Sequence, residues 1–357
     1  MNNDVENAVK EAAIKAISEL YHAYFTGLML TVTTRRSAAD AGRFTFQVFR
    51  RQHHDKFLSS LEKLGLSTLP HAVLAAQYHY LANGVGGVET QYMYESDQKA
   101  WVRFVHPRWM YEGTALCAIP VEVSHGFLNA WYGQNGVSLG NPRLGFVCAS
   151  QDMTGQYGMA GYFQEFDHDL APDQRVQFSP GEEAPPFDPA AAPVLDLSTW
   201  PAERLLRTRR NYAMDFVKVA IPELIGLFGP AEGSWFGNIT GQLIARQYYR
   251  QLADAVGITG DGPAEFARFM SAMATAQDDP HDWDQVDDTV FFRQQGWRMM
   301  RGRKDLHWSA FDAWNGLWEG ALSAHNRFLC LEVLQRLDYG DDCFEWRIRP
   351  RGPTNVG

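Results

Sequence analysis

The stretch DHDLAPDQRVQFSPGEEAPPFDPAAAPVLD, residues 167–196, divides the chain. Regular periodicity is interrupted there by the prolines Pro172, Pro180, Pro185, Pro186, Pro189 and Pro193. Seven acidic residues accompany a single base, Arg175, so this stretch holds −6 of the net charge of −10. Proline-stiffened acidic segments are typical of extended linkers. We therefore expect two domains, residues 1–166 and 200–357, joined by a linker over 167–199.

The two flanking parts show the same order of expected elements. Before the linker, the patterns predict helices at 5–33, 43–64, from Pro70 to about 84 and at 121–132, a hairpin at 88–95 and 99–106, and strands at 143–150 and 159–166. After the linker, they predict helices at 201–228, 238–256, 264–277 and 309–322, and strands at 288–293, 297–300, 327–335 and 342–348.

Short matches between residues follow this shared order. QVFRRQHH at 47–54 aligns with QLIARQYY at 242–249, and NAWYG at 129–133 aligns with GLWEG at 316–320. A third match aligns Cys148 with Cys330. The sequence therefore predicts an α+β fold built by tandem duplication of one helices-plus-antiparallel-sheet unit, which forms an intramolecular pseudo-dimer. Two unrelated α+β halves are the alternative.

Composition narrows the classes of partner. Acids exceed bases by 42 to 32, and no basic cluster longer than that around Arg209 is present, so a nucleic-acid partner is not expected. No apolar run reaches the length of a membrane span, and the start of the chain lacks the basic region of a signal peptide, so we expect a cytoplasmic protein. Aromatic residues make up 13% of the chain, which favours aromatic-lined pockets for small molecules.

The C-terminal segment LCLEVLQRLDYGDDCFEWRI, residues 329–348, resembles the closing strands of the 4-vinyl reductase type ligand-binding domain and of the related L-2-amino-thiazoline-4-carboxylic acid hydrolases. Glu332, Gly340, Asp341, Cys343 and Phe344 fit that pattern, whereas the position of the family's first cysteine is nearest to Gln335. The resemblance implies a small α+β domain whose pocket takes a small apolar or aromatic molecule, or a compact sulfur- and nitrogen-containing acid in the hydrolytic members.

Three residues are the candidate catalytic groups. Cys148 lies on an expected strand and His125 on the preceding helix, so an imidazole could activate the thiol as a nucleophile. Glu122 shares a helix face with His125 and is the alternative base. The same segment offers a metal set of His106, Glu122 and His125, although one Glu-x-x-His pair is not a complete site, and no metal or cofactor is assigned. Free cysteine is among the most buried residue types, so a role in the core is the favoured alternative for Cys148.

The candidate substrate-binding residues form matched pairs in the two halves. Arg51 and Arg246 could hold an organic carboxylate, and they could equally pair with acids on neighbouring helices. His54 and Tyr249 are expected to present a polar ring edge to a pocket. Trp131 and Trp318 are candidates for the pocket wall or for the core.

These expectations combine into a hypothesis about function. We expect a small-molecule enzyme, a hydrolase that opens a C–N or C–S bond of a small heterocyclic or aromatic acid in an aromatic-lined pocket. A non-catalytic small-molecule sensor or carrier is the first alternative, and a metal-dependent enzyme that uses a His/Glu set is the second. The expected partner is a small organic molecule, and a homodimer is left open.

Overall fold

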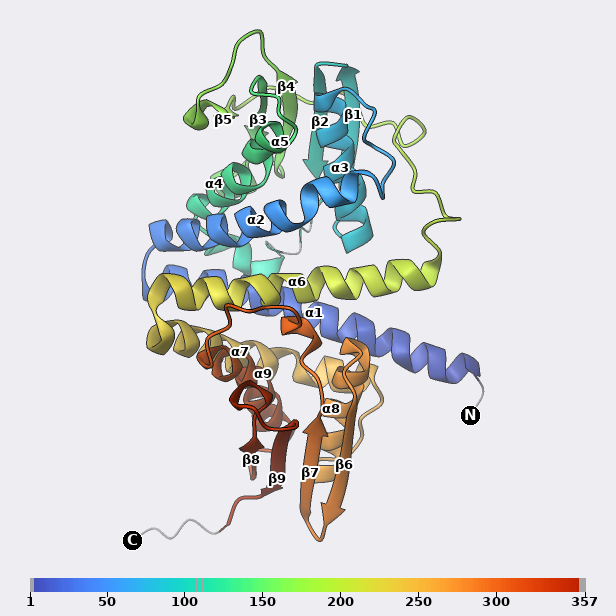
Figure 1. The fold of residues 1–357 in the computed structure, drawn as a ribbon, viewed down its shortest axis with the longest axis vertical. Coiled ribbons are helices and arrows are strands. Elements are labelled where there is room, and N and C mark those ends of the chain that lie inside the picture. The colour runs from blue at the N-terminus through green and yellow to red at the C-terminus, as the bar shows by residue number, and fades with distance from the viewer. Residues whose placement is uncertain (1–2, 107, 109, 111, 353–357) are drawn as a thin grey trace. The chain divides into compact units, whose positions relative to one another are not determined.

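The computed structural model describes residues 3–106, 108, 110 and 112–352, and its elements group into two compact units (Figure 1). The inserted unit comprises residues 29–209, and the split unit combines the chain up to residue 28 with the chain from residue 210 onward. The chain passes between the units inside two long helices, α1 (Asn3–Arg35) and α6 (Ala202–Phe228). This grouping differs from the expected division at the linker.

The inserted unit packs helices on one face of a five-stranded sheet. Its main helices are α2 (Ala38–Leu61), α3 (His71–Gly86) and α4 (Val121–Ala130), with a short α5 (Asn135–Ser138). Its strands, in the spatial order β1-β2-β4-β3-β5, are β1 (Thr90–Ser96), β2 (Lys99–Phe104), β3 (Leu144–Ser150), β4 (Ala160–Glu165) and β5 (Val176–Phe178). Only β5 runs parallel to its neighbour, β3.

The split unit has a four-stranded antiparallel sheet in the order β6-β7-β9-β8. Its strands are β6 (His281–Val286), β7 (Thr289–Gln294), β8 (Leu329–Gln335) and β9 (Phe344–Pro350). Its helices, besides parts of α1 and α6, are α7 (Pro230–Ala255), α8 (Pro263–Gln277) and α9 (Ser309–His325). The expected mixture of helices and antiparallel sheet is therefore confirmed in both units.

The start of α1 belongs to the split unit because two of its tyrosines bond to that unit's helices. Tyr24 Oη donates to the carbonyls of Gly237 on α7 and Ala313 on α9, at 3.0 and 3.1 Å. Tyr21 Oη donates to Oε1 of Gln277 at the end of α8. Buried hydroxyls of this kind need partners, and here the partners lie more than 200 residues away in sequence.

One expected strand is wrong. Residues 298–300 form a turn of 3-10 helix, and β7 instead pairs with β6 through a two-residue turn in which Asp287 has a φ of 55°. The strand β6 is hard to recognise because Asp282 and Asp284 belong to a residue type that is depleted in strands. Both acids pair across the hairpin with Arg293 on β7, which explains why a strand tolerates them.

The expected linker is folded onto the inserted unit. Residues 176–178 form β5, and Ala184 and Phe187 pack against Trp101, Val147 and Tyr162 on one face of the sheet. His79 of α3 stacks on Phe163, whose side chain points to the opposite face because neighbours in a strand alternate. Glu182 fixes the segment by accepting from Lys99 and Tyr162. The proline-rich segment thus covers the face of the sheet that the helices leave open.

Glycines allow the central helix pair of each unit to cross closely. On α9, a Cβ at Gly316 would collide with the carbonyl of Asn238 on α7, and one at Gly320 with that of Gln242. In the inserted unit, a Cβ at Gly126 on α4 would likewise collide with the carbonyl oxygen of Gly42 on α2. No helix in the described part of the chain is long and apolar enough to cross a bilayer.

We expect Gly316→Ala to destabilise the protein by about 1–3 kcal/mol, because the added methyl group overpacks the α7–α9 crossing. Gly226→Ala is the matched control, since nothing lies within 4 Å of a Cβ at this helical position. It should stabilise by about 0.5–1 kcal/mol through the higher helix propensity of alanine. Urea denaturation measures both effects, and equal stability of the two variants would contradict the close crossing.

Candidate functional site

A pocket of about 330 Å³ opens in the inserted unit where β3 ends. It lies at the small end of the usual range for ligand sites, about 300–1,000 Å³. Its walls come from the end of β3, from the turn that follows it and from β5. The lining residues are Cys148, Ala149, Ser150, Gln151, Thr154, Gln156, Phe178 and Pro180.

Hydrogen bonds within the turn after β3 stabilise its conformation. Ser150 Oγ lies 2.8 Å from the carbonyl of Gly158 and also reaches that of Tyr157. The backbone N–H of Gln151 donates to Oε1 of Gln156, and Thr154 Oγ1 donates to the carbonyl of Gln151. Because the turn is bonded to itself, the pocket wall is formed before any ligand arrives.

The structure places Cys148 at the pocket but does not activate its thiol. The residue is 1% exposed, and Sγ lies 3.4 Å from the carbonyl oxygen of Ser150. The pKa of Cys148 is raised to about 12, chiefly by burial and to a smaller extent by the nearby charge of Asp152, while the Ser150 contact opposes the shift. The thiolate is the nucleophilic form, so this cysteine is protonated and unreactive at neutral pH.

His125 lies beside the same pocket, whereas Glu122 does not face it. Cys148 is aligned with Phe178 in the β3–β5 pair, and the ring of His125 is 4.6 Å from the ring of Phe178. No hydrogen bond joins His125 to Cys148 among the described residues. Glu122 stands at the helix crossing, where its Cβ and carbonyl oxygen are 2.9 Å from the position of a Cβ on Gly42.

His106 and Asp152 form a second pair next to the pocket. Nε2 of His106 lies 3.6 Å from Oδ2 of Asp152, and the Asp152 side chain is almost completely buried. Within 3–106, 108, 110 and 112–352, no group of three or more His, Cys, Asp and Glu side chains is arranged to hold a metal ion. The alternative metal set of His106, Glu122 and His125 therefore gains no support.

On α2, the buried histidine is His53 and not the expected His54. The His54 side chain is 79% exposed and contacts Asp55. Adjacent helical residues point about 100° apart, so only one histidine of the pair can face the core. Trp131 packs at 5.7 Å edge-on against His53, just after the end of α4, and Arg51 is half-buried on α2. None of these residues lines the pocket described above.

A buried chain of side chains links three elements of the inserted unit. Nε2 of His53 lies 3.1 Å from Oδ1 of Asn135, whose Nδ2 lies 2.9 Å from Nε2 of His79. Burial lowers the pKa of His53 to about 4 and holds the pKa of His79 well below its usual value. Both imidazoles are therefore neutral near pH 7, and the chain fixes α2, α3 and α5 to one another.

The matched candidates of the split unit have structural partners. Tyr249 Oη lies 2.5 Å from Nδ1 of His325, and burial raises the pKa of this phenol. Trp318 is buried against Trp314. Arg246 is exposed and donates to Oε1 of Gln242 on its own helix.

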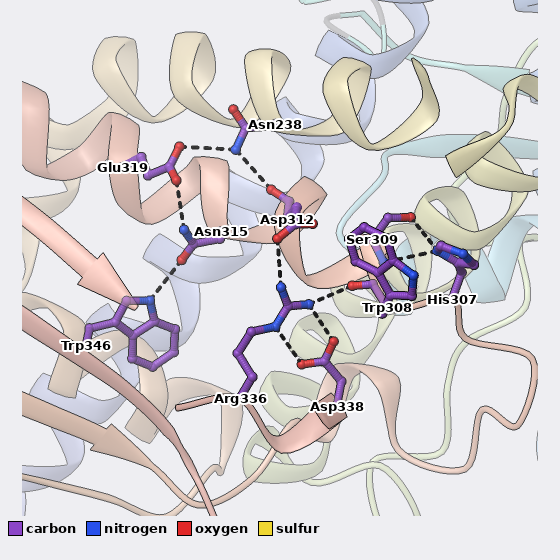
Figure 2. Close-up of polar contacts among 10 residues, drawn as sticks. All are labelled: Asn238, His307, Trp308, Ser309, Asp312, Asn315, Glu319, Arg336, Asp338 and Trp346. Atoms are coloured by element: carbon purple, nitrogen blue, oxygen red, sulfur yellow. Dashed lines mark hydrogen bonds and ion pairs between the residues drawn. The ribbon is translucent and has the colours of Figure 1, made fainter. Parts of the chain in front are cut away.

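Figure 2 shows a polar network around the start of α9 in the split unit. Arg336 donates to Asp312 at 3.0 Å, to both carboxylate oxygens of Asp338 and to the carbonyl of Trp308. Burial raises the pKa of Asp312, although Arg336 opposes the shift. The guanidinium thus fastens the β8–β9 connection to α9.

The same network continues along α9 through side-chain amides. Glu319 accepts hydrogen bonds from Asn238 and Gln242 on α7 and from Asn315, one turn away on α9. Asn315 in turn accepts from the indole N–H of Trp346 on β9, at 2.8 Å (Figure 2). Since these groups satisfy one another, the network holds α7, α9 and β9 together and leaves little capacity for a ligand.

His307 and Ser309 resemble a catalytic dyad in composition only. Ser309 Oγ lies 2.8 Å from Nδ1 of His307, and the backbone N–H of Ser309 donates to the same nitrogen. Ser309 is 2% exposed at the first turn of α9. The imidazole therefore caps the helix, and the hydroxyl is not accessible to a substrate.

The segment that carries the family resemblance forms β8 and β9. Glu332 on β8 pairs with Arg347 and Arg349 on β9. Sγ of Cys343 lies 3.5 Å from Oε1 of Gln335, the position nearest to the family's first cysteine. Comparison with protein-family models, with curated proteins and with solved structures finds no match to this chain.

Sequence reasoning identified Cys148 but missed most of the pocket around it. Gln151, Thr154 and Gln156 belong to a glycine-punctuated turn that carries no catalytic motif. Phe178 and Pro180 lie in the segment expected to be a linker. Gly155 and Gly158 both adopt positive φ, as a tight turn requires, and such glycines do not by themselves mark a pocket.

We expect the stability of the inserted unit to fall as the pH drops from about 6.5 to about 4. A buried neutral His53 has a lower pKa in the folded state than in the unfolded state, so its contribution is complete above the unfolded pKa. The loss amounts to about 3 kcal/mol at the acid end of this window. His53→Gln should flatten this part of the pH profile in urea denaturation, whereas the exposed-site control His54→Gln should not. Parallel profiles for the two variants would contradict the prediction.

We also expect iodoacetamide to alkylate exposed Cys117 long before Cys148 at about pH 8. The reason is the raised pKa and the burial of the Cys148 thiol. Peptide mass spectrometry over time gives the rate at each cysteine. Fastest labelling at Cys148 would restore the thiol as a candidate nucleophile.

Proposed function

We propose that the inserted unit binds a small organic molecule in the pocket at the end of β3. The observation that carries this proposal is the pocket itself, whose turn is bonded into shape and whose walls combine Phe178, Pro180 and Ala149 with amide and hydroxyl side chains. A largely apolar wall with a few polar groups is the usual composition of a ligand site. The protonated state of Cys148 supports a sensor or carrier more than thiol catalysis.

Hydrolysis of the bound molecule is the second candidate, and the position of His125 favours it. Its imidazole lies against Phe178 at the pocket wall. Because Cys148 is protonated at neutral pH, the nucleophile in this version is a water molecule, with His125 as the base. Opening of a C–N or C–S bond, as the family resemblance implies, remains part of this second candidate.

We further propose that the chain arose by duplication of one α+β unit. The support is the shared strand order, in which β1-β2-β4-β3 corresponds to β6-β7-β9-β8. The pair Gly42 and Gly237, each at a close helix crossing, has the same separation in sequence as the pair Gln47 and Gln242. The two copies differ in that β5 and the pocket belong to the inserted unit.

We expect Phe178→Ala to weaken binding of small aromatic probes by about tenfold, because it removes an apolar wall of the pocket. Phe178 is 42% exposed on a short edge strand, so the variant should still fold. Phe328→Ala is the matched control, since Phe328 is exposed in the split unit. Ligand-observed NMR titration with 2-phenylethanol measures the affinities. Equal weakening by both variants would contradict the proposal.

A further inference from the structure

We infer that the outer edge of β8 in the split unit binds an extended, acidic peptide segment of a partner protein, which joins the sheet as a parallel strand. β8 is an edge strand of the four-stranded sheet (Figure 1). The equivalent edge of the inserted unit is the edge of β3, and there β5 is the parallel neighbour. The site does not involve the pocket of the inserted unit.

The hairpins β3–β4 and β8–β9 have the same backbone plan. Each contains a bulge near the end of its first strand, just after Cys148 on β3 and just after Val333 on β8. Each first strand is followed by one turn of 3-10 helix, at 152–154 and at 337–339. Val333 therefore stands in the position of Cys148, and the edge of β8 corresponds to the edge of β3.

The edge of β3 is already occupied. Alternate residues of an antiparallel strand direct their backbone groups away from the partner strand, and on β3 these include Phe146 and Cys148. The N–H of Phe146 donates to the carbonyl of Arg175 at 2.8 Å, and the carbonyl of Cys148 accepts from the N–H of Ser179 at 2.9 Å. The residues of β5 thus satisfy the outward groups of β3.

The corresponding groups of β8 lack this strand. The N–H of Arg351 donates to the carbonyl of Phe328, so alternation turns Leu331 and Val333 outward. In the described part of the chain, no hydrogen bond reaches the outward backbone groups of these two residues. Val333 is 36% exposed, whereas Cys148 in the covered position is 1% exposed. An edge of this kind is a template for a strand of another chain.

The charge beside this edge favours an acidic partner. Arg327 precedes β8 and Arg351 follows β9, and both are exposed. Arg347 and Arg349 on β9 share a single acid, Glu332 on β8. These four cations and one acid form a basic surface, and complementary charge steers a partner to such a surface. The proline-rich segment that supplies β5 in the inserted unit is itself acidic.

The occupant of β3 also indicates which side chains the partner presents. Val176 and Phe178 of β5 lie beside the two outward residues of β3. When a peptide adds to a sheet edge, its main chain supplies affinity and its alternate side chains supply specificity. The partner strand should therefore place apolar side chains beside Leu331 and Val333, with acidic residues around them.

The probe is a synthetic peptide of residues 172–183, PDQRVQFSPGEE, which contains β5 with three acids and one base. Fluorescence anisotropy of the labelled peptide with the full chain gives a Kd. We expect Val333→Pro to weaken binding by about tenfold, because proline removes an outward N–H and is tolerated on an edge strand. Gln285→Pro is the matched control, at an exposed position on β6, the opposite edge of the same sheet, and should leave the Kd unchanged.

Two altered peptides test the mode of binding without a change to the protein, which keeps the inference testable if Val333→Pro does not fold. Gln177→Pro removes the N–H of the central strand residue and should abolish binding. Replacing the three acids together, by Asp173→Asn, Glu182→Gln and Glu183→Gln, should weaken binding about threefold, the usual effect of exposed charge pairs.

The inference is supported only if the peptide binds and both prolines weaken it. A wild-type chain that does not bind the peptide would overturn it, as would an affinity unaffected by Val333→Pro or by Gln177→Pro. Equal weakening by Val333→Pro and Gln285→Pro would reject β8 as the site. A dimer in sedimentation that Val333→Pro dissociates, without peptide binding, would assign the edge to a second copy of the chain and would also reject the inference.

Discussion

The close crossing of two helices beneath each sheet is the constraint on which the rest of the structure depends. In the split unit, Gly316 and Gly320 bring the backbone of α9 against that of α7, and in the inserted unit Gly126 does the same for α4 against α2. Side chains larger than hydrogen would force these helices apart. The crossing sets where α4 lies. His125 on α4 packs against Phe178, and Phe178 lines the pocket. The position of a candidate functional group thus depends on a glycine that takes no part in function.

Mutual hydrogen bonding marks the polar network around α9 as structural. Around α9, Arg336, Glu319 and Asn315 are each bonded to other protein groups (Figure 2), and such a network stabilises one arrangement of the helices and the sheet. The residues that line the pocket, by contrast, are all uncharged. The richer cluster of charged residues is therefore the weaker candidate for binding, and the uncharged pocket is the stronger candidate.

Much of the fold follows from the sequence because periodicity and capping residues mark its elements. Pro263 opens α8 as expected, and Ser37 caps α2 by accepting from the N–H of Asp40. The two strands that the sequence did not predict, β5 and β6, have a common feature: each depends on a partner in another segment of the chain. β6 carries acids that only Arg293 on the next strand makes acceptable, and β5 is a strand only because β3 lies beside it. Local patterns contain neither partner, so both segments resemble loops.

Cys148 shows why the location of a site is easier to predict than its chemistry. A cysteine that lies on a strand behind a glycine, and after a histidine-bearing helix, is a reasonable marker of position, and the structure does place it at a pocket. Reactivity depends on solvation and on nearby charge, and both raise the pKa of this thiol. The carboxylate that raises it belongs to Asp152, which sequence reasoning did not consider. Burial and the position of a neighbouring carboxylate are features of the folded structure, so a local sequence pattern marks the place of the site and not the reactivity of its thiol.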